Sequence, residues 1–150
     1  MNLKYIFIFL VTVGFISCKK DSQVSTQTLQ LLQIKWSLIS DETVLPTIPA
    51  YNSSYIGVAT DYYLFSTTDT LTIHQRSLAS SYTQSVTETF PYVVRNNNTL
   101  TYGPNMNFPI TIKRLTNDTL ILTNPVTASF INANGTTNTY PGTRTVILAR

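Results

Sequence analysis

The chain has 150 residues, with ten Lys and Arg, seven Asp and Glu, one His and one Cys. A single Cys excludes an intrachain disulfide and a Cys-x-x-Cys zinc or redox site, and a single His excludes a His-rich metal site. The formal charge of +3 is too small for a typical nucleic-acid-binding domain, which carries a clustered basic patch. We therefore expect no metal, no cofactor and no nucleic-acid partner.

The first 17 residues have the composition of a secretory signal. They hold twelve hydrophobic residues and one charge, Lys4. A basic start, an apolar run over 6–16 and a small residue, Ser17, at its end are the features of such a signal. The run is too short for a membrane span of about 20 residues, although a transmembrane anchor is the alternative interpretation.

Phe15-Ile16-Ser17-Cys18 resembles the lipobox of bacterial lipoproteins. In that family the signal is cut before the Cys, which receives a diacyl group on sulfur and usually a further acyl chain, such as palmitate, on its amine. The resemblance implies a signal peptide over 1–17 and lipidation of Cys18. Two or three acyl chains hold a protein stably on a bilayer. An ordinary signal peptide with a chance Cys is the alternative.

Lys19 follows the proposed lipidation site. By resemblance to the sorting rules of such lipoproteins, Lys rather than Asp at this position favours the outer membrane. Whether the domain faces the periplasm or the cell surface is left open. The polar residues after Cys18 show no periodic apolar face, so we expect a flexible tether over 18–31, whose last residues enter one short helical turn over 29–32 before the first strand.

From residue 32 onward the dominant hydrophobic period is two, which is typical of half-buried strands. Short connections rich in Asn, Asp and Gly separate these segments and favour antiparallel neighbours. The sequence predicts one all-β domain over 32–150, a single antiparallel meander of eight or nine short strands closed into a barrel. The segments expected as strands are 32–40, 61–65, 70–76, 86–94, 99–102, 108–115, 119–123, 126–131 and 143–149.

Alternation assigns faces within these strands. Trp36 and Leu38 share one face of the first. The other sets predicted to share a face are Tyr63 and Phe65; Leu71, Ile73 and Gln75; Phe90, Tyr92 and Val94; and Phe108, Ile110 and Ile112. The exception to this pattern is 41–60, twenty residues without a clear period, which we expect to be a long loop of the kind that often carries function.

The segment 32–40 resembles the first strand of the lipocalin-like domains of bacterial lipoproteins, which begin with Gly-x-Trp-x-Leu. Trp36 and Leu38 match, and Ile34 stands in place of the glycine. Tyr63-x-Phe65, Leu71-Thr-Ile73 and the stretch 112–123 are similar to later strands of that family. The resemblance implies a lipocalin-like barrel.

In lipocalins the Trp of the first strand packs under an Arg of the last strand. The resemblance therefore implies a structural contact of Trp36 with Arg150 or Arg144, a cation–π interaction of about 0.5–2 kcal/mol. Trp36 as a simple core aromatic is the equal alternative.

No catalytic constellation stands out. The sequence contains no nucleophile motif such as G-x-S-x-G that could act with His74. We therefore expect His74 to be an ordinary surface or barrel-lining polar residue. Glu42 and Glu88 are the one carboxylate pair considered for glycoside hydrolysis, which needs two carboxylates about 5–10 Å apart across a cleft. We do not expect an enzyme.

Tyrosine is the more informative residue, with nine in the chain. Tyr combines an apolar face with a polar tip and suits small amphipathic ligands, sugars and protein partners. Tyr51, Tyr55, Tyr63 and Tyr92 are the candidate ligand-binding residues, although ordinary strand and loop aromatics would give the same pattern. The sequence thus predicts an anchored protein that binds a small hydrophobic or amphipathic ligand without catalysis. The alternative is a cell-surface interaction or glycan-recognition module with a Tyr-rich face.

Overall fold

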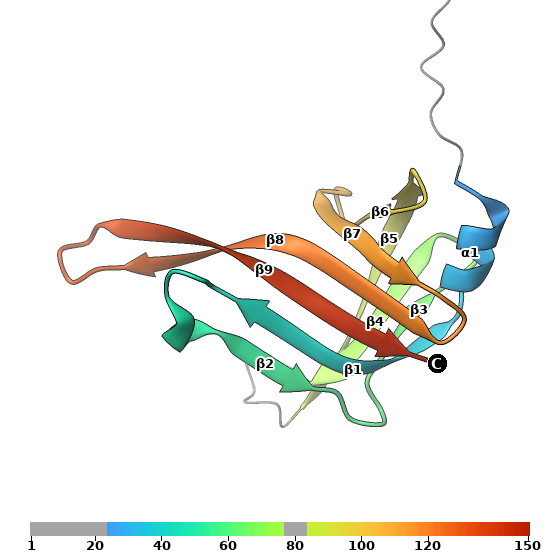
Figure 1. Cartoon of the computed structure of the whole chain (residues 1–150), viewed down its shortest axis with the longest axis horizontal. Coiled ribbons are helices and arrows are strands. Elements are labelled where there is room, and N and C mark those ends of the chain that lie inside the picture. The colour runs from blue at the N-terminus through green and yellow to red at the C-terminus, as the bar shows by residue number, and fades with distance from the viewer. Residues whose placement is uncertain (1–23, 77–83) are drawn as a thin grey trace, which may run out of the picture.

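The computed structural model describes residues 24–76 and 84–150 of the chain. The predicted signal peptide, Cys18 and the first part of the predicted tether lie outside the described residues. Within them, nine strands form one antiparallel sheet in the order β2-β1-β3-β4-β5-β6-β7-β8-β9, and a further pairing of β1 with β9 closes it. The predicted meander barrel is therefore confirmed, as an eight-stranded closed barrel with one extra strand, β2 (Figure 1).

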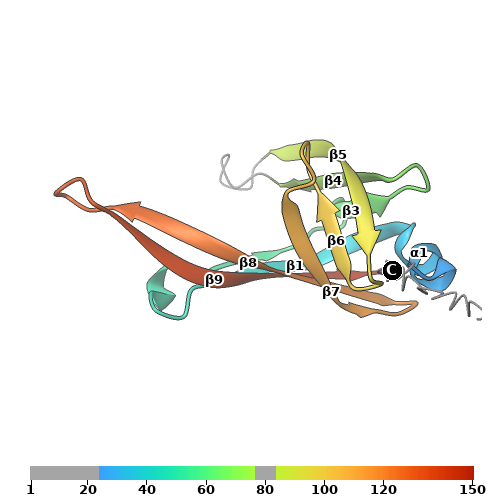
Figure 2. The ribbon, with the colours of Figure 1, turned by 90° about the horizontal axis from the view of Figure 1, so that it is seen from above.

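The strands follow one another with short turns, as Figures 1 and 2 show. The elements are α1 (Thr26–Leu32), β1 (Lys35–Val44), η1 (Pro49–Tyr51), β2 (Ser53–Ile56), β3 (Tyr62–Phe65), β4 (Thr70–Arg76), β5 (Ser85–Arg95), β6 (Thr99–Tyr102), β7 (Phe108–Leu115), β8 (Thr119–Ile131) and β9 (Thr137–Ala149).

The barrel interior near α1 is packed with side chains. The predicted alternation is confirmed for this core, because the shared faces point inward. Trp36, Phe65 and Leu100 are fully buried. The other buried apolar members of the cluster are Leu32, Leu38, Tyr63, Leu71, Ile73, Tyr92, Val94, Ile110, Ile112, Leu120, Leu122, Val146 and Leu148. Small barrels are commonly filled in this way by their own side chains.

The turns confirm that Asp and Asn stand where the sequence predicts short connections between strands. Asp69, Asn96 and Asn97 have φ of 56°, 53° and 60°, in the left-handed region that short polar side chains tolerate better than others. Gly135 has φ +80° in the β8–β9 turn. These residues let consecutive strands reverse within a few positions.

The predicted tether is wrong in its last part. A helix, α1, begins at Thr26, where the Ser25 hydroxyl accepts a hydrogen bond from the Thr28 amide (3.1 Å). Such a cap satisfies an otherwise unpaired helix amide. The helix covers one end of the barrel (Figure 1) and buries Leu32 completely. The predicted turn at 29–32 is only the end of it, because apolar burial against the barrel stabilises the full seven residues.

The predicted loop over 41–60 is also wrong in part. β1 continues to Val44, and β2 pairs with its second half, from Ser40↔Ile56 to Thr43↔Ser53. β3 pairs with the first half of β1 along the same edge. β2 and β3 thus run in line, separated by 57–61. Residues 41–44 and 53–56 of this segment thus belong to the barrel wall, and the bulge that precedes them in β1 shifts the alternation of its second half.

The last hairpin is longer than predicted. The segments 119–123 and 126–131 form one strand through Pro125, and β9 begins at Thr137 rather than at residue 143. The ladder between β8 and β9 runs without interruption from Thr119↔Ala149 to Ile131↔Thr137. Its outer half extends beyond the barrel as a two-stranded arm (Figures 1 and 2). We call residues 125–142 the arm.

Candidate functional site at the open end of the barrel

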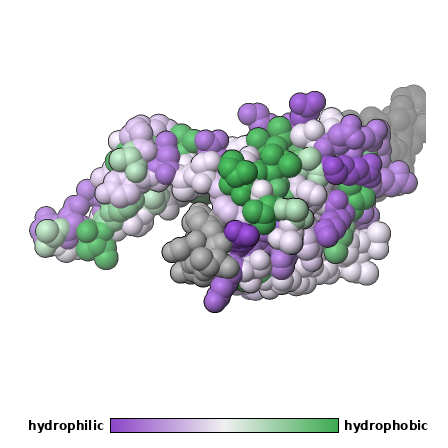
Figure 3. Space-filling view, turned by 90° about the horizontal axis from the view of Figure 1, so that it is seen from below, coloured by the Kyte–Doolittle hydropathy of each residue, from purple (hydrophilic) through white to green (hydrophobic). Residues whose placement is uncertain are grey.

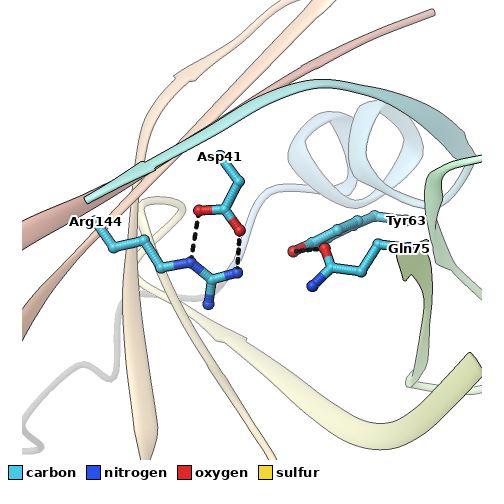
Figure 4. A network of polar contacts seen from close by, with 4 residues as sticks. All are labelled: Asp41, Tyr63, Gln75 and Arg144. Carbon is cyan, nitrogen blue, oxygen red and sulfur yellow. Dashed lines mark hydrogen bonds and ion pairs between the residues drawn. The ribbon is translucent and has the colours of Figure 1, made fainter. Parts of the chain in front are cut away.

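The barrel end opposite α1 carries charged side chains on its inner wall. Arg144 on β9 makes a two-pronged contact with Asp41 on β1, with Nε donating to Oδ1 (2.8 Å) and Nη2 to Oδ2 (2.5 Å). Both side chains are largely buried, with exposed fractions of 27% and 15%. Figure 4 shows the pair pointing into the barrel, toward Tyr63 and Gln75.

A bulge explains why Asp41 faces inward. The register between β1 and β9 passes from Leu38↔Leu148 to Ser40↔Ile147, so Ile39 is an extra residue on β1. Leu38 faces the core, and strict alternation would then turn Ser40 inward and Asp41 outward. With the bulge, Asp41 shares a face with its ladder neighbour Val146, which is buried.

Arg144 is held in its charged form. Its hydrogen bonds to Asp41 raise the pKa of the guanidinium further above its ordinary value. Burial raises the pKa of the neighbouring Tyr63 phenol, partly offset by the positive charge of Arg144. The Tyr63 hydroxyl also lies 3.4 Å from Gln75 Oε1. Asp41 takes one N–H each from Nε and Nη2, so one N–H of Nη2 and both of Nη1 remain for other contacts, such as that with Tyr63.

A second polar cluster lies where β2 gives way to β3. Asp61 is fully buried. Its Oδ2 accepts hydrogen bonds from the Tyr55 hydroxyl and from the Val58 amide, the latter at 3.0 Å. Burial raises the pKa of Tyr55 to about 12, with the hydrogen bond to Asp61 as the next cause. This cluster fixes the 57–61 connection and holds Tyr55 against the wall.

A polar cleft of about 350 Å³ opens beside these residues. Asp41 and Arg144 form one side, Gln75 and Arg76 another, and Tyr55 closes it on the β2 side. Thr43 and Ser53 complete the lining. The lining therefore offers two guanidinium groups, one carboxylate and several neutral hydrogen-bonding groups.

A second cleft, of about 460 Å³, includes aromatic and aliphatic residues in its lining and shares Arg144 with the first. Tyr102 and Phe108 lie 5.7 Å apart between ring centres with their planes tilted by 40°, and Phe90 meets Tyr102 edge-on at 5.6 Å. Phe108 is 52% exposed, so it forms a rim. The other lining residues are Asn107, Pro109, Ile110, Asn124, Pro125, Val126 and Thr127. Arg144 thus lies between a cleft lined by polar residues and one that also presents aromatic and aliphatic side chains.

The four candidate tyrosines do not gather at one site. Tyr55 lines the polar cleft and Tyr63 lies beneath it, beside Arg144. Tyr92 is buried toward the α1 end, where its hydroxyl donates to Ser66 O (2.9 Å) and accepts from Gln33 Nε2 (3.3 Å). Tyr51 lies on η1, 59% exposed and 4.5 Å from the Phe130 ring. Tyr51 therefore contacts the arm near its tip.

Trp36 is fully buried, and its indole N–H donates to Leu32 O (3.1 Å). Arg144 is paired with Asp41 instead. Arg150, at the α1 end of the barrel, is exposed, and its amide donates to Asp118 O (3.3 Å). Among the described residues, the cation–π contact is that of Lys35 over the Tyr62 ring, at 4.0 Å.

The residues considered for catalysis lie apart from the clefts. His74 faces outward, stacks on Tyr62 at 5.3 Å and contacts the Thr87 hydroxyl through Nδ1 (2.7 Å). Glu42 and Glu88 are exposed, and neither lines either cleft. In residues 24–76 and 84–150 no group of three His, Cys, Asp or Glu side chains is arranged to hold a metal ion.

Sequence reasoning missed the charged part of the site. Asp41 and Arg144 are 103 positions apart, and only the β1–β9 seam brings them together. A signal was present for Gln75, which alternation placed in phase with Leu71 and Ile73 on the inward face. A polar residue ending an inward-facing row marks the open end of a barrel.

Comparisons of the chain with protein-family models, with curated proteins and with solved structures find no match. Any proposal about function therefore rests on the geometry of the described residues. Across the described ranges, none of the helices combines the length and the apolar character that crossing a membrane requires.

Proposed function

We propose that this protein is a lipid-anchored, lipocalin-like binding protein that takes a small amphipathic ligand at the open end of its barrel, without catalysis. The observation that carries the proposal is the pair of clefts that share Arg144 in their linings. One half is polar, lined by Asp41, Gln75 and Tyr55, and the other presents Tyr102 and Phe108. A ligand with a polar head and a short apolar part matches both halves.

The packed core limits how deep a ligand reaches. The interior near α1 is filled by buried side chains, among them Trp36, Phe65 and Tyr92. A long acyl chain running down the barrel axis would have to displace them. The proposed ligand therefore lies across the open end, where binding sites of a few hundred Å³ suit small molecules.

Binding of the probe 1-anilinonaphthalene-8-sulfonate, followed by its fluorescence, tests this site. Octanoate, which has a head and a tail, should displace the probe, and acetate, which has a head alone, should not. Phe108→Ser and Gln75→Ala should each weaken octanoate binding several-fold. Val93→Ser, which changes an exposed apolar residue of the barrel wall, is the matched control. Equal binding by all four proteins, or none at millimolar octanoate, would contradict the proposal.

The anchor is proposed from the lipobox resemblance at Cys18, and the outer membrane from Lys19. Incorporation of labelled palmitate into the wild-type chain, and its loss in Cys18→Ala, tests the anchor. Separation of inner and outer membranes by density then tests the location. Label that persists in the variant would contradict lipidation at this residue.

A surface-recognition or glycan-binding module is the second candidate, favoured by one observation on the arm. Tyr51 is exposed beside Phe130, which in turn meets Tyr140 edge-on at 5.8 Å. The Asn138 amide lies 3.3 Å from the Tyr140 hydroxyl. Exposed aromatic rings with an adjacent amide suit sugar rings. A glycan array on which wild type binds and Tyr51→Ala does not would favour this candidate.

A further inference from the structure

The arm leaves the barrel because prolines end both ladders that would hold it. The register between β7 and β8 ends at Thr111↔Thr123. Two more residues on each strand would place Pro109 opposite Pro125. Proline has no N–H to give to a ladder, so pairing stops there. The departure of β8 from the barrel is therefore encoded in the sequence.

The other side of the hairpin repeats this arrangement. The register between β1 and β9 ends at Val44↔Thr143, and two further residues would place Pro46 opposite Pro141. Here the segment after β1 stays close. Leu45 is buried and packs against Gly142, where an added Cβ would lie 2.5 Å from the Leu45 side chain. Tyr51 packs on Phe130. Leu45 thus covers the base of the arm on the β9 side, and Tyr51 covers Phe130 near the tip.

The β8 edge of the arm is open. In both ribbon views no described segment lies beside β8 beyond the end of β7 (Figures 1 and 2). The Ile112 amide donates toward β6, to Asn98 O (2.7 Å). Backbone amides point alternately to the two sides of a strand, so the amides of Thr111 and its partner Thr123 face each other across the β7–β8 ladder. The same phase turns the amides of Thr127, Ser129 and Ile131 to the free edge.

An open strand edge is a template for pairing, and natural sheets usually protect such edges with charges. The stretch 119–143 contains no Asp, Glu, Lys or Arg. On the face seen in Figure 3 the arm shows green apolar patches among pale and purple residues, and Ile131 is 77% exposed. A two-stranded ribbon is also marginal by itself. Pairing of the open β8 edge with a further strand would therefore stabilise the arm.

We propose that this edge pairs with the same edge of a second copy of the chain, antiparallel about a two-fold axis at Ala128. That register places Val126 opposite Phe130 of the second copy, and Thr127 opposite Ser129, whose free-edge N–H and C=O groups then exchange hydrogen bonds. The small Ala128 meets itself at the closer, non-hydrogen-bonded type of pair. An uncharged strand opposes itself without like-charge repulsion, which is the reason that a second copy fits.

The interface is small, so the association is weak and reversible in dilute solution. Chains held on one membrane meet at a higher effective concentration, which strengthens a weak contact without new interactions. The two-fold pairing is isologous and closes at two copies.

Cysteine cross-linking of the full chain tests the pairing. In Ala128→Cys the two sulfurs would be within disulfide reach, since the paired Cα atoms lie about 4.5 Å apart. We expect a species of twice the chain mass on mild oxidation. Thr139→Cys, on the other edge of the arm, is the matched control, and the wild type gives the background from Cys18. Equal dimer in both variants, dimer in neither, or cross-linking mainly to other proteins would overturn the proposal.

A second pair of variants separates edge pairing from chance contact. Ser129→Pro removes a free-edge donor without touching the β8–β9 ladder, and should abolish the Ala128→Cys cross-link. Thr139 is the ladder partner of Ser129, so Thr139→Pro makes the same change on the other edge and should leave the cross-link intact. Unchanged circular dichroism confirms folding of each variant. A cross-link that survives Ser129→Pro would overturn the proposal.

Discussion

Arg144 and Asp41 join the last strand to the first, with both guanidinium–carboxylate hydrogen bonds made inside the barrel. The pair therefore lies on the seam that closes the sheet, and its Arg144 also lines both clefts. The same two side chains thus contribute both to the closing seam of the fold and to the lining of the candidate site.

The seam pair should show coupled energetics. Asp41→Asn or Arg144→Gln leaves one charge partly buried and without its partner, so each should lower the free energy of unfolding by about 1.5–3 kcal/mol. The double variant should lose less than the sum of the two. Urea unfolding of all four proteins measures the cycle. Strict additivity would mean that the contact contributes no specific stability.

Leu32 is the main point at which α1 closes the barrel. It is fully buried, and its carbonyl accepts the Trp36 indole N–H. Leu32→Ala should cost about 2–5 kcal/mol, as for other buried leucines. Trp36 is the only tryptophan, so its fluorescence emission reports opening of this end of the barrel. The emission should shift to longer wavelength in Leu32→Ala. Leu31→Ala, at an intermediate position of the same helix, is the control and should change both quantities little.

Gly57 is required by a close approach of two backbones. An added Cβ would lie 2.0 Å from Leu38 O and 2.6 Å from Leu38 C, and backbone atoms of a paired strand cannot move aside. Gly57→Ala should cost about 1–3 kcal/mol by overpacking and loosen β2. Gly135→Ala meets nothing within 4 Å, and its cost comes only from the left-handed φ. Denaturation midpoints compare the two, and an unchanged midpoint in Gly57→Ala would contradict the packing argument.

The Tyr55–Asp61 contact predicts a loss of stability in alkali. The pKa of Tyr55 is raised to about 12 from 10.0, so between these values the unfolded chain releases a proton that the folded chain retains. Stability from this contact is complete below pH 10 and falls as the pH rises toward 12. Tyr55→Phe should flatten this fall, and absorbance of tyrosinate near 295 nm should show one late-titrating group fewer. An identical pH profile in the variant would exclude this contribution.

The sequence predicts those parts of the fold that depend on local alternation. β7 was expected over 108–115 and β6 over 99–102, and both have these bounds, because the apolar period and the flanking turn residues agree. The bulge at Ile39 and the arm were not predictable in this way. Each depends on which residues stand opposite one another on strands that are distant in the sequence. The effect of Pro109 and Pro125 can be recognised only once the register between β7 and β8 is known.

The opposed prolines give a direct test of how the arm is released. In the double variant Pro109→Thr with Pro125→Thr, both positions regain an N–H that faces the other strand, so the β7–β8 ladder should lengthen by one pair of hydrogen bonds. The wild type has no amide at these positions, so the measurement is whether the two new amides exchange more slowly than unprotected amides. The single variant Pro109→Thr keeps proline opposite and should show less protection. The longer β7 would also cover the base of the β8 edge, so the Ala128→Cys cross-link should weaken in the double variant. Fast exchange at both positions in the double variant would mean that strand curvature, rather than the missing donors, separates the arm from the barrel.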